Sequence, residues 1–492
     1  EALKPALHRL ARKDVEDVLA AVGRGEISSP DVIKAVFPDY KDERVTATAK
    51  AREEGWVNLR NAAGMLFQTL YYFVDLYFVA ALGDAAVAGV SAAGNVMFIV
   101  LALTQVLGVG TVALISHAVG RKDQQDANLV FNQSLVIAAL SGLFVVVAGY
   151  FMAGPYLRAV AADEATIEAG KAYLYWFFPG LGLQFALVAM SSALRGTGIV
   201  KPTMIVQVLT VLLNTALAPV LIAGWGTGYA MGVAGAGLAS TISIAAGVVL
   251  LSIYFGRLEK YVSFHPEEWQ PRIAVWRRML SVGLPAGGEF ALMFFYTAIT
   301  YWAIRDFGAA AQAGFGIGSR VMQGIFMPAM AIAFVVAPIA GQNYGAKRME
   351  RVRETFRVAS VQCVGIMLVV MLLCQWRPEA LVAFFSKEPE VIRVGALFLH
   401  LISWNFVMSG LIFTCSGLFQ ALGNTVPALL SSASRLLVYG VPLMWLTAQP
   451  GFQIEHVWYL SIAASAVQAV ISVSLLRKQM RLQLGSPATQ PA

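Results

Sequence analysis

Charged residues are scarce in this sequence. Asp, Glu, Lys and Arg make up 13% of the 492 residues, while hydrophobic residues make up 58%. A soluble globular protein carries about 25% charged residues, so a chain this long and this apolar cannot coat its own core with polar groups. The composition therefore excludes a soluble globular fold and indicates an integral membrane protein whose surface faces lipid.

Cysteine is equally rare, and motifs that carry chemistry are missing. The three cysteines (Cys363, Cys374 and Cys415) lie inside apolar runs, and an odd number cannot form a complete disulfide framework. The sequence shows no nucleophile–base set, no metal-ligand cluster and no phosphate-binding glycine loop. We therefore expect neither an enzyme nor a protein with a bound cofactor or a structural metal.

The net charge of +7 does not indicate a nucleic-acid partner. Lys and Arg collect in short segments between apolar runs, as in Lys347, Arg348, Arg351, Arg353 and Arg357. Cytoplasmic loops of membrane proteins carry such an excess of positive charge. The distribution of these residues over alternate loops predicts that both termini are cytoplasmic, with the lipid bilayer rather than nucleic acid as the partner.

Twelve apolar runs are each long enough to cross a bilayer, which takes about 20 residues in a helix. The runs lie near 62–81, 87–119, 128–152, 171–196, 202–223, 230–256, 279–304, 314–341, 356–376, 392–421, 426–448 and 455–476. This pattern predicts an all-α integral membrane protein with a first six-helix lobe over 62–256, a cytoplasmic linker over 257–278 and a second six-helix lobe over 279–478. We expect a soluble helical appendage over 1–60 and a disordered tail over 479–492.

The two predicted lobes are related by an internal repeat at an offset of 225 residues. Gly83–Gly89 aligns with Gly308–Gly314, and Gly120-Arg121-Lys122 aligns with Gly345-Ala346-Lys347. Because each unit holds six crossings, both lobes insert the same way up, and a pseudo-two-fold axis runs along the membrane normal. Secondary transporters use this architecture, with the substrate path between the lobes. The alternative is a duplicated membrane protein without transport, which the polar residues at membrane depth disfavour.

Short motifs in a fixed order resemble those of the multidrug and toxic compound extrusion (MATE) family over residues 64–480. They are Phe73-Val74-Asp75, Leu82–Gly89, Leu194–Gly198, Leu213-Asn214, Gly283-Leu284-Pro285 and Ala337–Gly345. The resemblance implies two six-helix bundles that export small, often cationic organic compounds in exchange for H+ or Na+ by alternating access. The lack of a nucleotide-binding motif agrees with an ion gradient as the energy source.

Asp75 lies in the middle of an aromatic, apolar run that includes Tyr72. A carboxylate at membrane depth costs about 3 kcal/mol, so it needs a partner, a proton or a cation. Burial favours the protonated form and an approaching cation favours the charged form, which gives a physical basis for exchanging a proton against a cationic solute. We predict that Asp75 is the ion-coupling carboxyl and that Asp75 and Tyr72 line the substrate cavity. The alternative is an Asp that only hydrogen-bonds neighbouring helices.

Two further residues match the amino-terminal ion site of the family. The resemblance places Asn214 and Ser240 beside Asp75, where their oxygens and main-chain carbonyls could bind Na+. Ala218, however, stands where many relatives have a second carboxylate. A lone carboxyl can still carry a proton, so we favour H+ as the coupling ion, with Na+ at Asp75 and Asn214 as the alternative. Interhelical hydrogen bonds are the other explanation for Asn214 and Ser240.

The second lobe offers its own polar residues at membrane depth. Glu289 lies one turn after Pro285, in the region where some relatives place a carboxyl, and Arg320 lies on the next predicted helix. We expect Glu289 to take part in ion coupling, and Glu289, Arg320, Asn405 and Arg435 to line the substrate cavity. The alternative for Glu289 and Arg320 is a structural ion pair, since buried charges pair.

The first 60 residues differ from the rest of the chain in being charged and amphipathic. The helix pattern over Asp14–Glu26 is followed by a Ser28-Ser29-Pro30 helix start. With the segment Phe37–Arg44, it resembles the helical stretch after the regulatory domain of Rel-type stringent factors, without any catalytic motif of those enzymes. The repeat places Arg60 where a partner of Pro285 is expected, so the first spanning helix is short at its inner end, as in a fusion.

These patterns are best explained by a monomeric multidrug efflux antiporter of the bacterial inner membrane, whose partners are small organic substrates and lipid. A related flippase for lipid-linked saccharides is the nearest alternative, and it would need a cavity lined by several Arg or Lys. A membrane regulatory protein with an N-terminal sensing segment is a third, which removal of residues 1–60 would test.

Overall fold

A computed structural model describes residues 78–79, 82–160, 163–259, 261–383, 385 and 388–484. The chain divides into two units, Glu1–Val57 and Asn58–Ala492, and all described residues belong to the second. The predicted appendage over 1–60, as well as Tyr72 and Asp75 on the first predicted span, lie outside the described residues.

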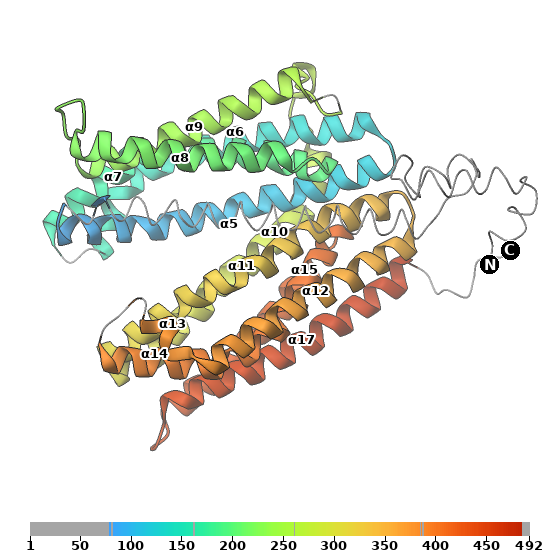
Figure 1. The fold of residues 1–492 in the computed structure, drawn as a ribbon. Helices are drawn as coiled ribbons and strands as arrows, with labels where there is room; N and C mark the ends of the chain where they lie inside the picture. The colour runs from blue at the N-terminus through green and yellow to red at the C-terminus, as the bar shows by residue number, and fades with distance from the viewer. Residues whose placement is uncertain are drawn as a thin grey trace, which may run out of the picture. The chain divides into compact units, whose positions relative to one another are not determined.

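The described chain is almost entirely helical (Figure 1). Its first half contains α5 (Asp84–Gly120), α6 (Gln124–Val160), α7 (Glu164–Thr197), α8 (Lys201–Ala223) and α9 (Val233–Arg257). Its second half contains α10 (Ile273–Ile304), α11 (Ala309–Gly345), α12 (Met349–Trp376), α13 (Pro378–Ala383), α14 (Pro389–Ile402), α15 (Trp404–Ala421), α16 (Val426–Leu446) and α17 (Ile454–Leu484). Two 3₁₀ turns, η1 (Pro266–Glu268) and η2 (Arg305–Phe307), flank α10.

Ten helices in the described ranges are long and apolar enough to cross a bilayer. The pair α14 and α15 forms an eleventh candidate crossing, which is bent by 53°. These crossings agree in position with eleven of the twelve predicted spans, and most of the remaining span, near 62–81, lies outside the described residues. The predicted all-α integral membrane fold class is therefore confirmed.

The span expected near 392–421 is broken rather than continuous, because α14 and α15 meet at an angle at Ser403. Ser403 Oγ donates a hydrogen bond to the carbonyl of His400 (2.9 Å) and accepts one from Gln375 Nε2 (2.8 Å). Side-chain bonds to the backbone of this kind bend helices. The sequence pattern of apolar residues does not reveal such a bend.

Two predicted boundaries also need correction. α10 begins at Ile273, so the linker covers 258–272 rather than 257–278. α17 continues to Leu484, because Gln479 is buried and extends the packed face of the helix beyond 478. The tail expected from 479 is therefore helical as far as Leu484, and 485–492 lies outside the described residues.

The repeat predicted from the sequence is confirmed by the ends of equivalent helices. α5 and α11 begin and end at positions that differ by 225 residues. Gly83 and Gly308, which precede them, have φ angles of 105° and 89°, and Lys122 and Lys347, which follow them, have φ angles of 60° and 57°. Positive φ is uncommon for a residue other than glycine. Its recurrence at equivalent lysines shows that both halves use the same turn.

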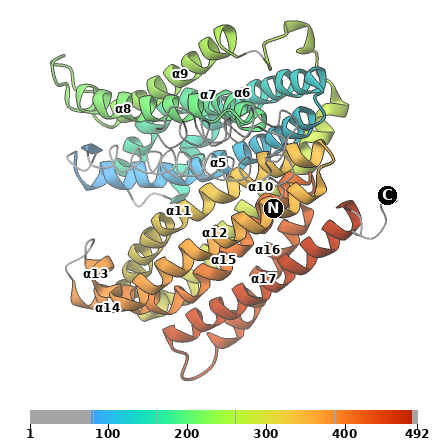
Figure 2. The ribbon, with the colours of Figure 1, turned by 45° about the vertical axis from the view of Figure 1, so that its right-hand side comes forward.

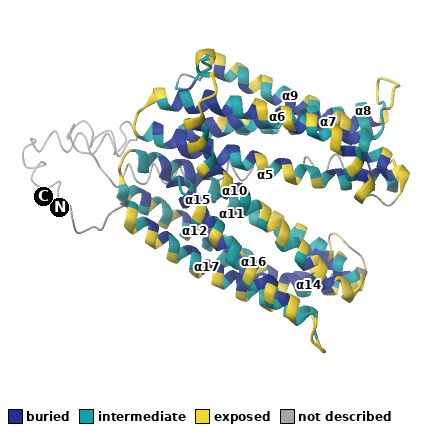
Figure 3. Cartoon of the chain, turned by 180° about the vertical axis from the view of Figure 1, so that it is seen from behind, coloured by how far each residue is buried: buried dark blue, intermediate teal, exposed yellow. Residues whose placement is uncertain are grey.

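Each half has its own buried apolar core, and α10 joins the two halves. The beginning of α10 packs against α5 and its later turns pack against α16. Figures 1 and 2 show α5 and α11 side by side near their C-terminal ends and diverging toward their N-terminal ends. In Figure 3 exposed residues follow the outer faces of the helices. Many of these are large and apolar, such as Phe144, Phe151 and Leu437, as expected of surfaces that contact lipid.

Candidate functional site

Glu289 lies in the middle of α10, and hydroxyl groups from two other helices point at its carboxyl. Its Oε2 accepts a hydrogen bond from Ser416 Oγ on α15 (2.9 Å), and its Oε1 accepts one from Ser432 Oγ on α16 (3.3 Å). Ser432 Oγ also accepts a hydrogen bond from Gln468 Nε2 on α17 (3.2 Å). Among the described residues, the partners of this carboxyl are all neutral.

Glycines before Glu289 bring α10 close to the first half. A Cβ on Gly283 would collide with the carbonyl oxygen of Val106 on α5, and one on Gly287 would collide with the side chain of the same valine. Only glycine permits so close an approach of two backbones. The apolar contact beside these glycines is made of Val109, Ala113, Val282 and Ala286.

A second group of polar residues lies next to Glu289. It includes Arg435, one turn after Ser432 on α16, and Tyr296, two turns after Glu289 on α10. The Arg435 guanidinium lies over the Tyr296 ring, with 4.4 Å between Cζ and the ring centroid. Arg435 Nε is buried and has no hydrogen-bond partner in the described ranges. The Tyr296 hydroxyl shares a 2.6 Å hydrogen bond with Ser461 Oγ, which also accepts one from Asn405 Nδ2 (3.2 Å).

Three of the predicted cavity residues, Glu289, Asn405 and Arg435, thus lie on packed helices in one region of the second half. Together with their polar neighbours they form what we call the second-half polar cluster. It consists of Glu289, Tyr296, Asn405, Ser432, Arg435 and Ser461. Four helices, α10, α15, α16 and α17, contribute to it. In the described ranges no group of three or more His, Cys, Asp or Glu is placed to hold a metal ion.

Arg320 is not part of this cluster, and the ion pair considered for Glu289 and Arg320 is not formed. Arg320 is exposed and lies about four turns before Phe334 on the same side of α11. The Phe334 ring lies 5.8 Å from Cζ of Arg195, which belongs to the first half. These contacts do not place Arg320 itself against the first half, and its place in the lining of the substrate cavity stays a prediction.

The first half contains the predicted pair of Asn214 and Ser240, and these two residues are in contact. Asn214 Nδ2 donates a hydrogen bond to Ser240 Oγ (3.2 Å), and both side chains are fully buried. Asn214 Oδ1 has no partner among the described residues, and Ala218 on the next turn is buried as well. Asp75 and Tyr72 lie outside the described residues, so their place beside this pair stays a prediction.

The repeat relates Asp75 and Asn214 to a described pair in the second half. At the offset of 225, Asp75 corresponds to Thr300 and Asn214 corresponds to Tyr439. Thr300 Oγ1 and the Tyr439 hydroxyl are buried and share a hydrogen bond of 2.9 Å. This second-half pair shows that the two positions can be neighbours in the shared fold.

Reciprocal hydrogen bonds join the halves where the C-terminal ends of α5 and α11 meet. His117 Nε2 on α5 donates to the carbonyl of Ala421 (2.6 Å), and Gln342 Nε2 on α11 donates to the carbonyl of Gly196 (2.8 Å). Glycine allows this approach, since a Cβ on Gly345 would collide with the carbonyl of His117. The two halves are thus closely packed at these ends.

Charged residues add an ion-pair network at the same end of the molecule. Asp126 at the start of α6 pairs with Arg121 (2.8 Å) and with Arg278 on α10 (3.1 Å). The loops over 121–123 and 346–348 lie at this end, as do the described residues of the linker, 258–259 and 261–272. We call it the basic end. The linker is fixed there as well, because its backbone bonds to amide side chains of α6.

The sequence analysis missed the partners of the predicted residues and the contacts between the halves. Ser416 and Ser432 are common residue types in a membrane helix, and nothing in their spacing marks them as neighbours of Glu289. The equivalence of His117 and Gln342 was available from the repeat, but their hydrogen bonds depend on how the halves dock.

Comparisons with known proteins agree with this architecture. A family model described as MatE matches residues 62–220 and 285–446, and one described as RelA/SpoT AH domain matches 1–37. The relatives include a probable multidrug resistance protein, YoeA of Bacillus subtilis, which is 25% identical over 79% of this chain and 85% of its own length. The multidrug export protein MepA of Staphylococcus haemolyticus is 23% identical over 86% of this chain and 93% of its own length.

Solved structures show the same fold. A crystal structure of a MATE protein in the bent conformation has a TM-score of 0.82 at 21% identity, covering 87% of this chain and 95% of the other. An outward-facing multidrug resistance MATE family transporter of the MOP superfamily has a TM-score of 0.81 at 22% identity, again covering 87% and 95%. Since the MatE model matches more than half of the chain and the folds agree, this protein belongs to the multidrug and toxic compound extrusion (MATE) family of membrane transporters.

Proposed function

We propose that this protein is a multidrug efflux antiporter of the bacterial plasma membrane, which exports small organic compounds in exchange for H+ or Na+. The observation that carries the proposal is the second-half polar cluster, in which a carboxyl, a guanidinium and several hydroxyls and amides lie at membrane depth on four helices. Such groups are costly inside a bilayer and mark substrate and ion pathways. The relatives named as multidrug resistance and export proteins support the same substrate class.

Glu289 is the coupling group of the second half in this proposal. Its carboxyl has hydroxyl donors in Ser416 and Ser432 and no cationic partner among the described residues. A carboxyl in such a setting either holds a proton or pairs with a cation that arrives from water. A cationic substrate that reaches Glu289 favours the charged form and releases the proton, and this release is the exchange step.

Asp75 is the coupling group of the first half. The hydrogen bond between Thr300 and Tyr439 supports a neighbouring arrangement of Asp75 and Asn214, which occupy the equivalent positions. Asn214 Oδ1 and the hydroxyl of Ser240 would then offer neutral oxygens beside one carboxylate. A proton needs only the carboxyl, whereas Na+ needs these oxygens as further ligands, and we favour the proton.

The substrate cavity in this proposal lies between the halves and carries both signs of charge. Its carboxyls, Asp75 and Glu289, attract cations, and its aromatic rings, Tyr72 and Tyr296, can contact flat or cationic groups. Arg320, Arg435 and Asn405 complete the lining. Two arginines are fewer basic groups than the binding of a pyrophosphate would call for, which disfavours a flippase for lipid-linked saccharides.

The packing of the halves supports alternating access. The basic end is closed by reciprocal hydrogen bonds, while the N-terminal ends of α5 and α11 diverge (Figure 2). The positive-inside rule assigns the basic end to the cytoplasm, with both termini there, so in this proposal the diverging ends of α5 and α11 face the outside. The opposite state requires that the hydrogen bonds at the basic end break while the other ends approach.

Transport by the purified monomer in proteoliposomes tests this function. We expect a fluorescent organic cation to be moved by an imposed pH gradient or an imposed Na+ gradient, and the effective gradient names the ion. Movement of a labelled lipid-linked saccharide with no response to either gradient would support the flippase instead. A chain without residues 1–57 should transport the same compounds. If neither the full chain nor the chain without residues 1–57 transports, and the shortened chain loses a regulated response that the full chain has, the regulatory alternative is supported.

A further inference from the structure

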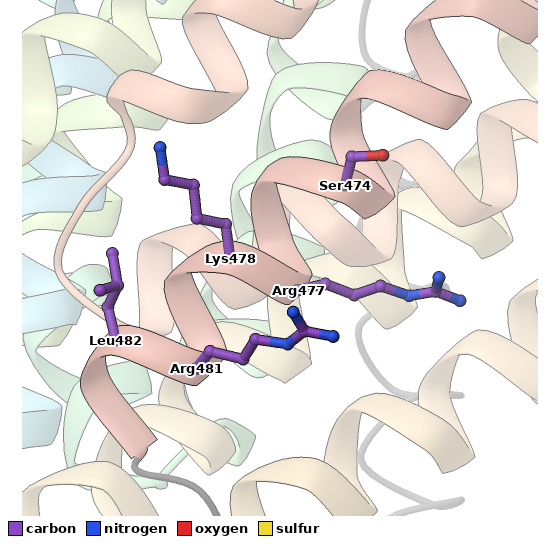
Figure 4. Close-up of a pocket in the computed structure, with 5 residues that line it drawn as sticks. All are labelled: Ser474, Arg477, Lys478, Arg481 and Leu482. Atoms are coloured by element: carbon purple, nitrogen blue, oxygen red, sulfur yellow. The ribbon is translucent and has the colours of Figure 1, made fainter.

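We propose that the C-terminal end of α17 is a binding site for the phosphate headgroup of an anionic phospholipid. Ser474, Arg477 and Arg481 line a surface hollow of about 390 Å³, together with Lys478 and Leu482. Figure 4 shows the two arginines pointing to the same side of the helix, with Lys478 directed to the other side. The two guanidinium groups lie one helical turn apart.

These cations have no acidic partner among the described residues. No ion pair joins Arg477, Lys478 or Arg481 to an Asp or Glu within the part of the chain that the structure describes. The sequence has no acidic residue between Glu455 and Ala492. Like charges four residues apart on a helix destabilise it. An anion bound between the two arginines would remove this repulsion.

The hollow lies at the basic end of the molecule, at the edge of the apolar span of α17. Ser472 Oγ, about one and a half turns before Arg477, shares a hydrogen bond with Ser431 Oγ near the start of α16. At that start, Thr425 Oγ1 donates to the carbonyl of Val282 on α10. The arginines therefore lie on the same side of the membrane as the linker, at the depth where an apolar helix meets the headgroup layer.

The face of α17 that carries the arginines favours a lipid over a free phosphate ion. Val467 and Val470 are exposed and lie on the same helical face as Ser474, Arg477 and Arg481, at spacings of three and four residues. This face is apolar toward the membrane interior and basic at its end. Guanidinium and hydroxyl groups donate to phosphate oxygens, and acyl chains can lie along the valines.

Native mass spectrometry of the full chain in detergent tests the site, with phosphatidylglycerol and phosphatidylcholine of identical acyl chains as probes. We expect the wild type to retain phosphatidylglycerol in preference to phosphatidylcholine. The double variant Arg477→Gln/Arg481→Gln should bind phosphatidylglycerol roughly 30-fold more weakly, from the usual contribution of two basic side chains near anionic lipid. The double variant Arg257→Gln/Arg348→Gln removes the same charge from exposed positions elsewhere and should bind like the wild type.

Further experiments distinguish a specific lipid site from general attraction between charges and from loss of the fold. Arg477→Lys/Arg481→Lys keeps the charge and should retain part of the binding, and its melting temperature reports folding. Inorganic phosphate at millimolar concentration should not displace the lipid. Equal binding by the wild type and the glutamine variant, or equal loss in the control variant, would overturn the proposal. So would complete displacement by phosphate with no preference for phosphatidylglycerol.

Discussion

His117 on α5 and Gln342 on α11 occupy equivalent positions in the two halves, and each donates a hydrogen bond to the equivalent backbone carbonyl of the opposite half. The distances are 2.6 Å from His117 to Ala421 and 2.8 Å from Gln342 to Gly196. The two donors are 225 residues apart in the sequence, and so are the two acceptors. The same type of hydrogen bond therefore closes the basic end twice, with one donor from each half.

Removing these donors should weaken the closure of the basic end. A typical hydrogen bond contributes about 1 kcal/mol, so His117→Ala and Gln342→Ala should each raise the open population about fivefold. The reaction of a water-soluble maleimide with Ala113→Cys, a position buried between the halves, measures that population. The three native cysteines are buried and give a low background.

Two controls make this prediction specific. His117→Gln introduces the residue type found at the equivalent position, Gln342, which can donate the same hydrogen bond. Cysteine labelling in this variant should be as slow as in the protein with His117. Gln375→Ala removes a similar bond, from Gln375 Nε2 to the carbonyl of His400 (2.7 Å), but within the second half. If Gln375→Ala accelerates labelling as much as His117→Ala does, the reciprocal bonds do not close this end.

Gly283→Ala should destabilise the protein by about 1–3 kcal/mol, because the added methyl group collides with the carbonyl of Val106. The midpoint of thermal unfolding in detergent measures the effect. Gly365→Ala on α12 is the matched control, since a Cβ there meets no atom within 4 Å. Alanine favours helix more than glycine does, so the control should be neutral or slightly stabilising. Equal midpoints for both variants would contradict the packing described for α10.

Gln133→Ala should release the linker from α6. Gln133 Oε1 accepts hydrogen bonds from the backbone N–H of Arg272 (2.9 Å) and from Trp276 Nε1 (2.7 Å), and its Nε2 donates to the carbonyl of Gln270 (2.8 Å). Loss of these bonds should cost about 2–3 kcal/mol and expose the linker to protease. Gln483→Ala, at the far end of α17, should leave cleavage of the linker unchanged. Protection of the linker in Gln133→Ala would refute this role.

The start of α7 should become less stable in acid. The Asp163 side chain accepts a hydrogen bond from the Thr166 backbone N–H (2.7 Å), and this bond lowers the pKa of the carboxyl. A lowered pKa in the folded state means that the stabilisation is complete above the usual Asp pKa of about 4 and is lost as pH falls through the lowered value. The protection factor for hydrogen exchange at Thr166, which is the intrinsic exchange rate at the same pH divided by the observed rate, should therefore fall at low pH in the wild type. Asp163→Asn should keep the cap and abolish this pH response; a response that persists would contradict the assignment.

Much of this fold could be predicted from the sequence because a bilayer imposes simple rules. Apolar length defines each crossing, and the offset of 225 related α5 to α11 to the residue. The bend at Ser403 could not be predicted, since it depends on a hydrogen bond from Gln375, on another helix. The helical extension to Leu484 depends on burial of Gln479, a polar residue that pattern analysis assigns to a tail.

The candidate site was only partly predictable. Glu289, Asn405 and Arg435 stand out in the sequence because polar groups are rare at membrane depth. Arg320 is equally conspicuous, and the sequence left open whether it pairs with Glu289. Pairing depends on which faces of α10 and α11 meet. Partners such as Ser432 are defined by packing, and packing is not visible in one sequence.

The central claim of this account is that membrane-embedded carboxyls exchange an ion for the exported compound. Gradient-driven efflux of a fluorescent organic cation from proteoliposomes tests it most directly, with wild type, Asp75→Asn, Glu289→Gln and the exposed control Glu379→Gln compared at equal protein density. We predict that Asp75→Asn and Glu289→Gln each lose more than about tenfold of the gradient-driven rate, since each lacks a coupling group worth at least about 1.4 kcal/mol. Glu379→Gln should match the wild type. Full gradient-driven transport by both Asp75→Asn and Glu289→Gln would contradict the claim.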